Sequence, residues 1–339
     1  MLKRFIAEVV EGKDLNEEEA SQAMGHIMEG EALPTQIASF LTALRMKGET
    51  SPEIAGFARA MQAKAVRIRA KEGECVVDTC GTGGDGCGTF NISTAVAFVA
   101  AGGGLTVAKH GNRSVSSRSG SADVLEALGV NIALPPEKAE ACLRQNRLAF
   151  LFAPSFHPAM KHALAPRKEI GIRTAFNLLG PVMNPAGATV HLLGIYCEDL
   201  TRLVAEVLRS LGSKAAFVVH GADRCDEISI TGKTTVCQLK DGAITSYQVE
   251  PEDAGLKRAS LESIRGGTPE KNAGILLQIL KGEPGPPRDV VLLNGAAVFV
   301  ASGKASNLKE GIEMAREAID SGKAMEKLEG LIEFSHRDR

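Results

Sequence analysis

The segment from Asp78 to Thr94 constrains this chain most, because five of its seventeen residues are glycine. A β-rich run, Cys75 to Val77, precedes it, and a helix is expected to open near Ser93. Backbone N–H groups of such a loop, together with the N-terminus of the helix that follows, can bind an anion without any charged side chain. The sequence therefore predicts a strand, a glycine-rich anion-binding loop and a helix.

Two familiar nucleotide-binding motifs do not fit this loop. Gly81, Gly83 and Gly86 satisfy G-x-G-x-x-G, but a dinucleotide site also needs an acidic residue about 20 positions further on. The chain has no Asp or Glu between Gly86 and Ala122. No Gly-Lys-Ser/Thr follows either, which excludes the P-loop pattern. A plain tight turn is the alternative, but five glycines next to several polar side chains favour a ligand site.

The acid-free stretch carries several cations, namely Lys109, Arg113 and Arg118, with His110 beside them. Cations and hydroxyls without a countercharge are typical of a site for a phosphate-rich ligand. A solvated basic loop is the alternative. The formal net charge of −2 and an aromatic content of 4% favour a small ligand over a long polyanion, so no nucleic-acid partner is expected.

Two further sets of residues carry charge suited to chemistry. Asp226 and Glu227 follow the apolar run Ala215 to Val219, and carboxylates at the end of a strand can hold Mg²⁺. A solvated acidic pair is the alternative. Arg167 has the planar fork that suits a carboxylate, although a surface or capping arginine is equally compatible with its position.

The domain organisation changes near residue 72. Before it, Asn16 and Glu19 form a capping-box pattern, and apolar residues recur at helical spacing after Pro34 and after Pro52. After it, helical stretches alternate with β-rich runs, expected at 75–77, 105–108, 149–152, 190–195, 215–219 and 290–293, and a hairpin is expected at 228–249 around Asp241-Gly242. We expect a small helical domain, 1–72, and a large α/β domain, 73–339; a central helical segment near 166–180 could join the first.

Cysteine usage and hydropathy indicate a cytoplasmic protein. The seven cysteines are odd in number and contain no C-x-x-C pair, which favours reduced thiols over disulfides or structural zinc. The longest weakly polar run, Ala95 to Ala108, is too short to span a bilayer, and Glu8 interrupts the N-terminal apolar residues of a would-be signal peptide. No membrane partner is expected.

Four strings closely resemble the anthranilate phosphoribosyltransferases of tryptophan biosynthesis: GTGGDGCGTFNIST, KHGNRSVSS, SGSADVLEALG and RKEIGIRTAFNLLGPVMNP. The resemblance covers nearly the whole chain. It implies a small helical domain hinged to a large α/β domain with a central, mostly parallel sheet, as in nucleoside phosphorylases and phosphoribosyltransferases. It also implies a homodimer that uses anthranilate, 5-phosphoribosyl 1-pyrophosphate and one or two Mg²⁺ ions.

The resemblance assigns roles residue by residue. Matching positions place the following around the phosphoribosyl pyrophosphate: Gly81, Gly84, Asp85, Thr89, Asn91, Ile92, Ser93, Thr94, Lys109, His110, Gly111, Asn112, Arg113, Ser114, Val115, Ser116, Ser117 and Ser121. The anthranilate positions are Gly81, Asn112 and Arg167, the metal positions are Ser93, Asp226 and Glu227, and the catalytic pair is Lys109 and Arg167. Arg224-Cys225 departs from the usual Gly-Leu of the family, which questions the local loop shape but not the carboxylates.

The chemistry of the expected reaction agrees with the residue types. Displacement of pyrophosphate from the anomeric carbon passes through an oxocarbenium-like state, so stabilising the departing negative charge is the main task. The amine of anthranilate is neutral at pH 7 and needs no strong base. Two alternatives remain open at this point: a pyrimidine nucleoside phosphorylase, and a non-catalytic relative that binds nucleic acid through the same basic loops.

Overall fold

The computed structural model describes residues 2–114 and 118–337. A bundle of four helices opens the chain: α1 (Leu2–Val10), α2 (Glu17–Met28), α3 (Pro34–Lys47) and α4 (Ser51–Ala63). The Asn16 side chain accepts a hydrogen bond from the Glu19 N–H at 2.9 Å and the Glu19 carboxylate accepts one from the Asn16 N–H, so the predicted capping box is confirmed. Pro34 and Pro52 open their helices as expected.

An α/β unit follows, in which strands alternate with helices. The strands are β1 (Val76–Gly81), β2 (Thr106–Gly111), β3 (Leu148–Phe152), β4 (Val190–Gly194), β5 (Ala215–Gly221), β6 (Thr234–Lys240) and β7 (Ala243–Val249). The helices are α5 (Ile92–Gly102), α6 (Ser121–Ala127), α7 (Pro136–Asn146), α8 (Ala153–Phe156), α9 (Lys161–Ile170), α10 (Phe176–Val182), α11 (Leu200–Ser210), α12 (Pro269–Leu280), α13 (Pro286–Ala301), α14 (Leu308–Asp320) and α15 (Lys323–His336). Short 3₁₀ turns lie at Pro158–Met160, Pro251–Ala254 and Leu261–Ile264.

In the described part of the chain the strands form one seven-stranded sheet in the order β3-β2-β1-β4-β5-β6-β7. The first five strands in this order are parallel, and β6 and β7 extend the edge as an antiparallel hairpin. Asp241 and Gly242 take φ of 50° and 78° at its turn, the geometry that Asp-Gly predicts. The predicted fold class, a helical unit followed by an α/β unit with a mostly parallel sheet, is therefore confirmed.

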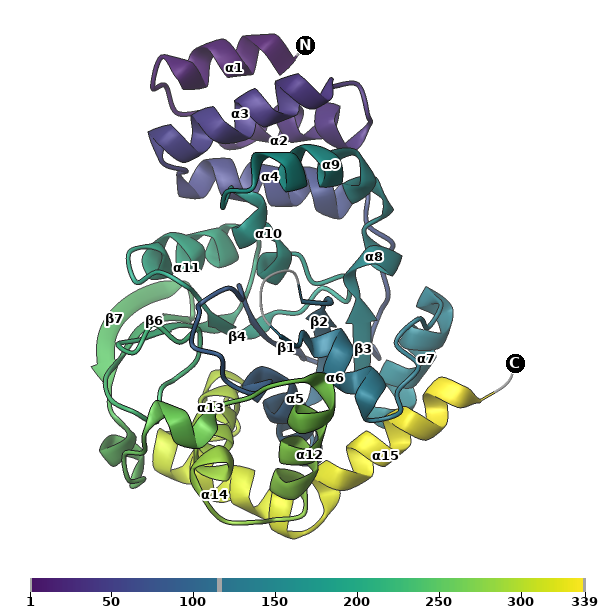
Figure 1. Cartoon of the computed structure of the whole chain (residues 1–339), viewed down its shortest axis with the longest axis vertical. Coiled ribbons are helices and arrows are strands. Elements are labelled where there is room, and N and C mark those ends of the chain that lie inside the picture. Colours follow the sequence, from purple (N-terminus) through teal and green to yellow (C-terminus); the bar gives the residue numbers. More distant parts are fainter. Residues whose placement is uncertain (1, 115–117, 338–339) are drawn as a thin grey trace.

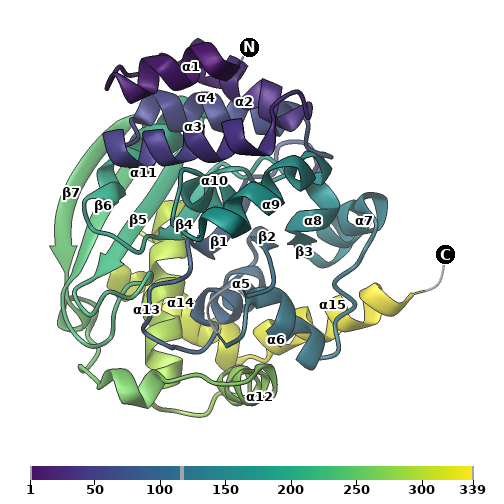
Figure 2. The same cartoon turned by 45° about the horizontal axis from the view of Figure 1, so that its top comes forward.

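The two faces of the sheet feed two cores, and the β5 side chains alternate between them. Phe217 and Val219 join the larger core with α5 and α13, while Ala216 and Val218 join a second core with α11 and the N-terminal helices. Figures 1 and 2 show the N-terminal helices above the sheet, with α5, α13 and α14 below it. Helix α9 packs against α3 and α2, so residues far apart in sequence share the upper layer.

One expected strand is wrong, because residues 290–293 lie within α13. Val290, Val291, Leu292 and Leu293 are all buried, since this helix runs through the larger core and is covered on every side. A helix that is apolar all round lacks the 3.6-residue stripe and cannot be told from a buried strand by periodicity. The prolines at its first turn were the signal in favour of a helix.

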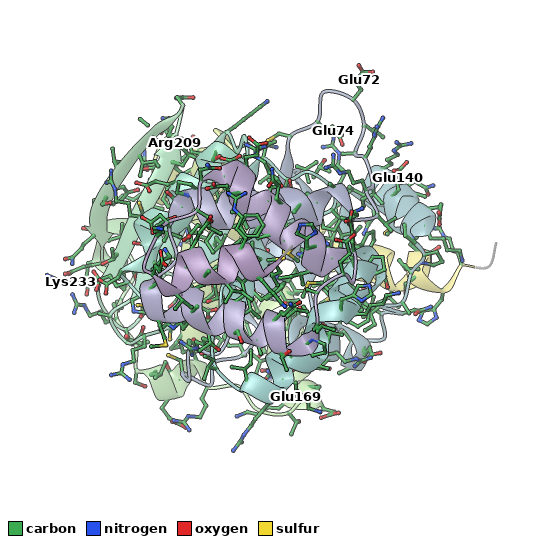
Figure 3. All side chains as sticks on the ribbon, turned by 90° about the horizontal axis from the view of Figure 1, so that it is seen from above. Glu72, Glu74, Glu140, Glu169, Arg209 and Lys233 are labelled. Atoms are coloured by element: carbon green, nitrogen blue, oxygen red, sulfur yellow. The ribbon has the colours of Figure 1, made fainter. Side chains whose placement is uncertain are left out.

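No helix among the described residues is long and apolar enough to cross a membrane. Charged side chains such as Glu169, Arg209 and Lys233 instead project from the periphery, as the view from above the helical unit shows (Figure 3).

Candidate active site

The glycine-rich loop leaves the carboxyl end of β1, at the edge where parallel strands of an open sheet place their ligands. Gly83, Gly84 and Gly86 take φ of 67°, 70° and 81°, a left-handed backbone that disfavours side chains. The loop then enters α5 at Ile92, so the N–H groups of its first turn face the same edge. The predicted strand, loop and helix are all present.

The loop after β5 brings the acidic pair directly against the ends of β1 and β4. A Cβ atom on Gly194 would lie 1.4 Å from the backbone oxygen of Asp226, and one on Gly81 would lie 2.3 Å from an Asp226 carboxylate oxygen. Only glycine at these two strand ends leaves room for the acidic loop. The lack of a side chain at Gly81 therefore leaves the space that the Asp226 carboxylate occupies.

The two carboxylates of this loop point to different partners. An Asp226 oxygen accepts the Gly83 N–H at 2.7 Å, and Glu227 Oε1 accepts the Ser93 N–H at 3.1 Å. Burial raises the pKa of both groups; the charge of Asp85 adds to this at Asp226, and the charge of Asp226 adds to it at Glu227. No salt bridge neutralises either carboxylate within the described residues.

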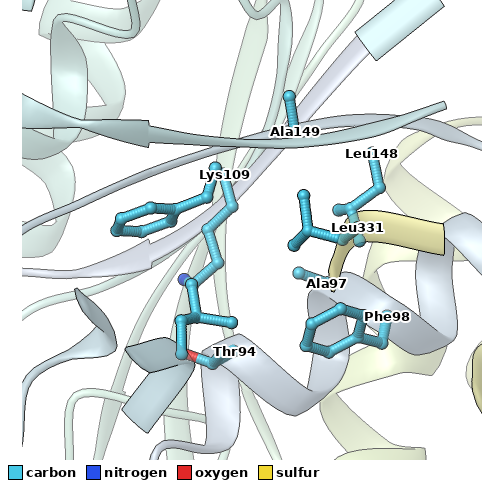
Figure 4. Close-up of a pocket in the computed structure, with 9 residues that line it drawn as sticks. Thr94, Ala97, Phe98, Lys109, Leu148, Ala149 and Leu331 are labelled. Carbon is cyan, nitrogen blue, oxygen red and sulfur yellow. The ribbon is translucent and has the colours of Figure 1, made fainter. Parts of the chain in front are cut away.

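Lys109, at the end of β2, lies 3% exposed beside this group. Its ammonium donates to the backbone oxygen of Thr79 at 2.5 Å and to Ser93 Oγ at 3.3 Å. Burial lowers its pKa, while the charges of Asp78 and Glu227 act in the opposite direction. Figure 4 shows the Lys109 side chain reaching toward the first turn of α5, where Thr94 lies. Ser93 is thus held between Lys109 and Glu227.

These groups fit a hard divalent cation. Asp226 and Glu227 offer several carboxylate oxygens beside one buried ammonium, and burial together with neighbouring negative charge raises the pKa of both groups. Oxygen-only ligands are those that Mg²⁺ prefers, and Mg²⁺ usually takes one or two carboxylates and completes its shell with water and phosphate. The residues present therefore match a magnesium site.

The basic run after β2 differs from what its sequence indicated. Arg113 donates to Glu126 Oε1 at 2.8 Å and to Asp123 Oδ1 at 3.1 Å, so the expected lack of a countercharge is wrong for this residue. These two acids come from α6, directly after the acid-free stretch. His110 is 6% exposed, bonds to the Gly180 carbonyl oxygen at 3.1 Å, and burial lowers its pKa to about 3. The imidazole is therefore neutral at pH 7.

Arg167 lies on α9 with its guanidinium 4.7 Å from the centre of the Phe176 ring. Burial lowers its pKa, and no acidic residue pairs with it in the part of the chain that the structure describes. No hydrogen bond or ion pair among the described residues joins Arg167 to Asn112 or Gly81, the other two positions predicted for anthranilate. Arg167 is a cation available for a carboxylate ligand.

The remaining predicted residues surround the same strand ends. Asn91 Nδ2 donates to the Ser119 carbonyl oxygen at 3.1 Å, and Ser121 Oγ donates to that of Asn112 at 3.3 Å. Thr94 Oγ1 is buried without a hydrogen-bond partner in the described structure. Ile92 is buried in the first turn of α5, Gly111 ends β2, Ser114 donates its N–H to Asp123, and Thr89 bridges Arg265. Val115, Ser116 and Ser117 lie outside the described residues.

Sequence reasoning missed several supporting residues. Asn184 Nδ2 donates to an Asp78 oxygen and to the Ala108 carbonyl oxygen, each at 2.7 Å, and burial raises the pKa of Asp78 to about 6. Asn272 Nδ2 donates to Asn91 Oδ1 at 2.9 Å and fixes that side chain. An acidic residue inside an apolar strand was the signal available for Asp78; Asn272 lies on a distant helix and had none.

Arg173 is a further missed residue, in the connection between α9 and α10. It donates a hydrogen bond to the carbonyl oxygen of Gly84, and its guanidinium lies 4.0 Å from the centre of the Tyr196 ring. It therefore joins the segment that carries Arg167 to the glycine-rich loop.

Known proteins are similar to this chain over nearly its whole length. Residues 3–65 match the model of the glycosyl transferase family helical bundle domain, and residues 73–325 match that of the glycosyl transferase family a/b domain. An anthranilate phosphoribosyltransferase of Moorella thermoacetica is 56% identical over 332 residues, 98% of each chain. The chain belongs to the anthranilate phosphoribosyltransferase family.

Solved structures of the anthranilate phosphoribosyltransferase family agree with the fold. The crystal structure of the Thermus thermophilus enzyme superposes with a TM-score of 0.93 at 45% identity, covering 98% of this chain and 99% of that one. The Saccharomyces cerevisiae enzyme in complex with PRPP and Mg gives a TM-score of 0.89 at 32% identity, with 98% and 97% coverage. The same yeast enzyme has also been solved in complex with 4-fluoroanthranilate.

Proposed function

We propose that this chain transfers the phosphoribosyl group of 5-phosphoribosyl 1-pyrophosphate to the amine of anthranilate, a step of tryptophan biosynthesis. A bond forms between the anomeric carbon and the nitrogen, the bond from that carbon to the pyrophosphate oxygen breaks, and the amine loses a proton. The observation that carries this proposal is the group of Lys109, Asp226 and Glu227 beside the glycine-rich loop. Full-length similarity to the family supports it.

Ser93, Asp226 and Glu227 are the proposed magnesium ligands. When bound, Mg²⁺ supplies positive charge that stabilises the departing pyrophosphate. The chain itself orients these ligands: Gly83 N–H holds Asp226 and Ser93 N–H holds Glu227. Fixed ligands of this kind need little rearrangement when charge develops.

Lys109 and the loop amides are the proposed anion-stabilising groups. The Lys109 ammonium is buried, and its three donors are only partly used by Thr79 and Ser93. Glycines with left-handed backbone shape the loop that leads into α5, and the dipole at the start of that helix favours negative charge. The other predicted phosphoribosyl pyrophosphate residues complete this proposed site, except Arg113, whose guanidinium already pairs with Asp123 and Glu126.

Arg167 is the proposed partner of the anthranilate carboxylate, and Asn112 and Gly81 are the other proposed anthranilate residues. Its guanidinium is half-buried against Phe176 and has no acidic partner among the described residues, so a carboxylate ligand would supply the missing charge. Because the amine is already neutral, the chain needs to orient it and exclude water rather than remove a proton before attack.

We propose a boundary near residue 72, between a helical domain (1–72) and an α/β domain (73–339), with the 166–180 segment moving with the first. The packing of α9 against α2 and α3, and of α10 against α4, supports grouping this segment with the first domain. The Arg173 hydrogen bond would then mark the closed arrangement of the two domains, since it links the 166–180 segment to the glycine-rich loop.

A homodimer through the helical domain is also proposed. Large apolar side chains are exposed on one set of helices, with Val10 68%, Met46 83% and Leu164 57% exposed on α1, α3 and α9. A contiguous exposed apolar patch is typical of an interface, and these side chains are the proposed members of one. Light scattering with Met46→Glu tests the dimer: a monomeric variant supports it, and a monomeric parent protein excludes it.

Seven free cysteines support the proposed cytoplasmic location.

The fluorescence of anthranilate gives a direct test of the activity. Its loss on adding 5-phosphoribosyl 1-pyrophosphate and Mg²⁺, matched by pyrophosphate release and stopped by a chelator, is the expected result. Uridine or thymidine consumed with phosphate, in place of anthranilate, would overturn the proposal and favour a nucleoside phosphorylase.

A further inference from the structure

Two cysteines far apart in sequence meet between the glycine-rich loop and the acidic loop. Cys87 belongs to the first loop and Cys225 to the second, and both are buried. The two sulfur atoms and a carboxylate oxygen of Asp85 all lie within 4.8 Å of one another. Neither thiol has a role in the proposed transfer reaction.

The backbone of both loops holds these three groups in place. Asp85 Oδ1 accepts the Cys87 N–H at 3.1 Å, and Asp85 Oδ2 accepts the Asp226 N–H at 3.3 Å. The Cys225 N–H donates to Asp223 Oδ1 at 3.1 Å, and the Cys87 thiol donates to the Asp223 carbonyl oxygen at 3.2 Å. The cluster is therefore part of the loop structure and not a chance approach of mobile side chains.

Two sulfur ligands and one carboxylate select a different ion from the neighbouring oxygen ligands. Zn²⁺ binds cysteine sulfur and carboxylate oxygen in tetrahedral sites and takes water at an open position, whereas Mg²⁺ avoids sulfur. We propose that Cys87, Cys225 and Asp85 form a binding site for a thiophilic divalent ion such as Zn²⁺, distinct from the magnesium position at Asp226 and Glu227. On binding, each thiol loses one proton to solvent, and the two thiolates and the carboxylate coordinate the ion.

Occupation of this site would link the two loops that flank the substrates. The ion would engage Asp85, which the proposed function places at the phosphoribosyl pyrophosphate, and it would fix the acidic loop by the residue next to Asp226. We therefore expect Zn²⁺ to inhibit the transfer reaction reversibly. This consequence rests on the proposed function, whereas the binding itself does not.

Cobalt substitution tests the site without any activity measurement. Co²⁺ is added anaerobically to the full chain, kept reduced with a phosphine and saturated with Mg²⁺; thiolate-to-cobalt charge-transfer absorption is expected, and Zn²⁺ is expected to abolish it. Loss of an outer-shell partner alone costs about 10- to 100-fold in metal affinity, so loss of a direct ligand in Cys225→Ala or Cys87→Ser should weaken Co²⁺ binding by about 100-fold or more. Cys75→Ala, which removes an exposed thiol outside the cluster, is the matched control and should retain the absorption.

The two cysteine variants lie on separate loops, so one remains informative if the other folds poorly, as circular dichroism will show. Absence of the absorption in the parent protein, or its persistence in a folded Cys225→Ala or Cys87→Ser variant, would overturn the site. A cobalt spectrum that behaves as expected in a protein without transferase activity would uphold the site and overturn the proposed function, so the two can fail separately.

Discussion

The acidic loop after β5 and the basic run after β2 differ in whether their charged side chains find partners of opposite charge in the folded chain. The basic run looked unbalanced, yet Arg113 is paired with Glu126 and Asp123, and His110 is neutral. The acidic loop was predicted to hold Mg²⁺, with a solvated acidic pair as the alternative, and its carboxylates are buried or half-buried and lack a salt bridge in the described structure. Unbalanced charge in space, and not along the chain, indicates where a ligand binds.

Burial explains why this difference matters. A buried charge without a partner lowers the stability of the folded chain. Such a charge is therefore expected where a bound ligand supplies the partner. The acidic loop and Arg167 meet this description, and Arg113 does not. Substitutions in the two regions should therefore have unequal effects.

Asp226→Asn should have the largest effect. Asparagine keeps an oxygen that can accept the Gly83 N–H but removes the charge, so we expect kcat/KM to fall by at least about 100-fold. The free energy of unfolding without Mg²⁺ should stay constant or rise by up to about 1 kcal/mol, because a buried repulsion with Asp85 disappears. Steady-state kinetics and urea unfolding in chelator measure the two quantities.

Asp223→Asn is a useful control for that variant. Asp223 belongs to the same loop but accepts hydrogen bonds from Ser229 and Thr231, so its loss should affect stability more than the dependence of the rate on Mg²⁺. If Asp226→Asn instead kept the parent rate and Mg²⁺ dependence, the acidic loop would not be the metal site.

The two arginines give the second comparison. Arg167→Gln should raise KM for anthranilate by about 10- to 100-fold, since a charge-assisted hydrogen bond to the carboxylate is lost. Arg113→Gln, the matched control, should change KM for 5-phosphoribosyl 1-pyrophosphate by less than about threefold, because that guanidinium already pairs with Glu126. A large effect at Arg113 would show that it leaves Glu126 when the substrate binds.

The third comparison concerns His110, whose protonation makes the free energy of unfolding depend on pH. Burial lowers its folded pKa from 6.5 to about 3, so the unfolded chain binds more protons between these values. The contribution of neutral His110 to the free energy of unfolding is complete above pH 6.5. It is lost as the pH falls, by about 2 kcal/mol between pH 6.5 and 5. His157 and His191, with pKa values lowered to about 4, act in the same direction. His110→Gln should flatten the acid side of the stability curve, measured by thermal unfolding; an imidazolium NMR signal from His110 at pH 5 would contradict this.

Local signals account for what the sequence predicted well. The capping box at Asn16, the prolines at helix starts and the turn at Asp241-Gly242 each act within a few residues, and each is present. The strand at 290–293 fails because complete burial of a helix removes its period, and only the surrounding core decides its structure. Tertiary context overrides local pattern there.

The candidate site likewise contains features that local sequence determines and features that contacts between distant segments determine. The glycine-rich loop was predictable because left-handed backbone needs glycine at known positions. The pairing of Arg113, the Asp78–Asn184 bond and the support of Asn91 by Asn272 depend on contacts between distant segments. A single sequence holds no direct signal for such contacts.

Arg224 gives the smallest predicted effect, and it concerns the shape of the acidic loop. Its φ of 73° lies in the left-handed region, and its N–H donates to the Gly221 carbonyl oxygen at 2.8 Å while the Gly221 N–H donates to the Cys225 carbonyl oxygen. The tight turn, not the side chain, therefore sets the position of Asp226. Arg224→Gly should relieve strain and raise the free energy of unfolding by up to about 1 kcal/mol, with activity unchanged. Arg224→Ala removes the same charge but keeps a Cβ, so it should not stabilise; equal stabilisation by both variants would assign the effect to charge instead of backbone.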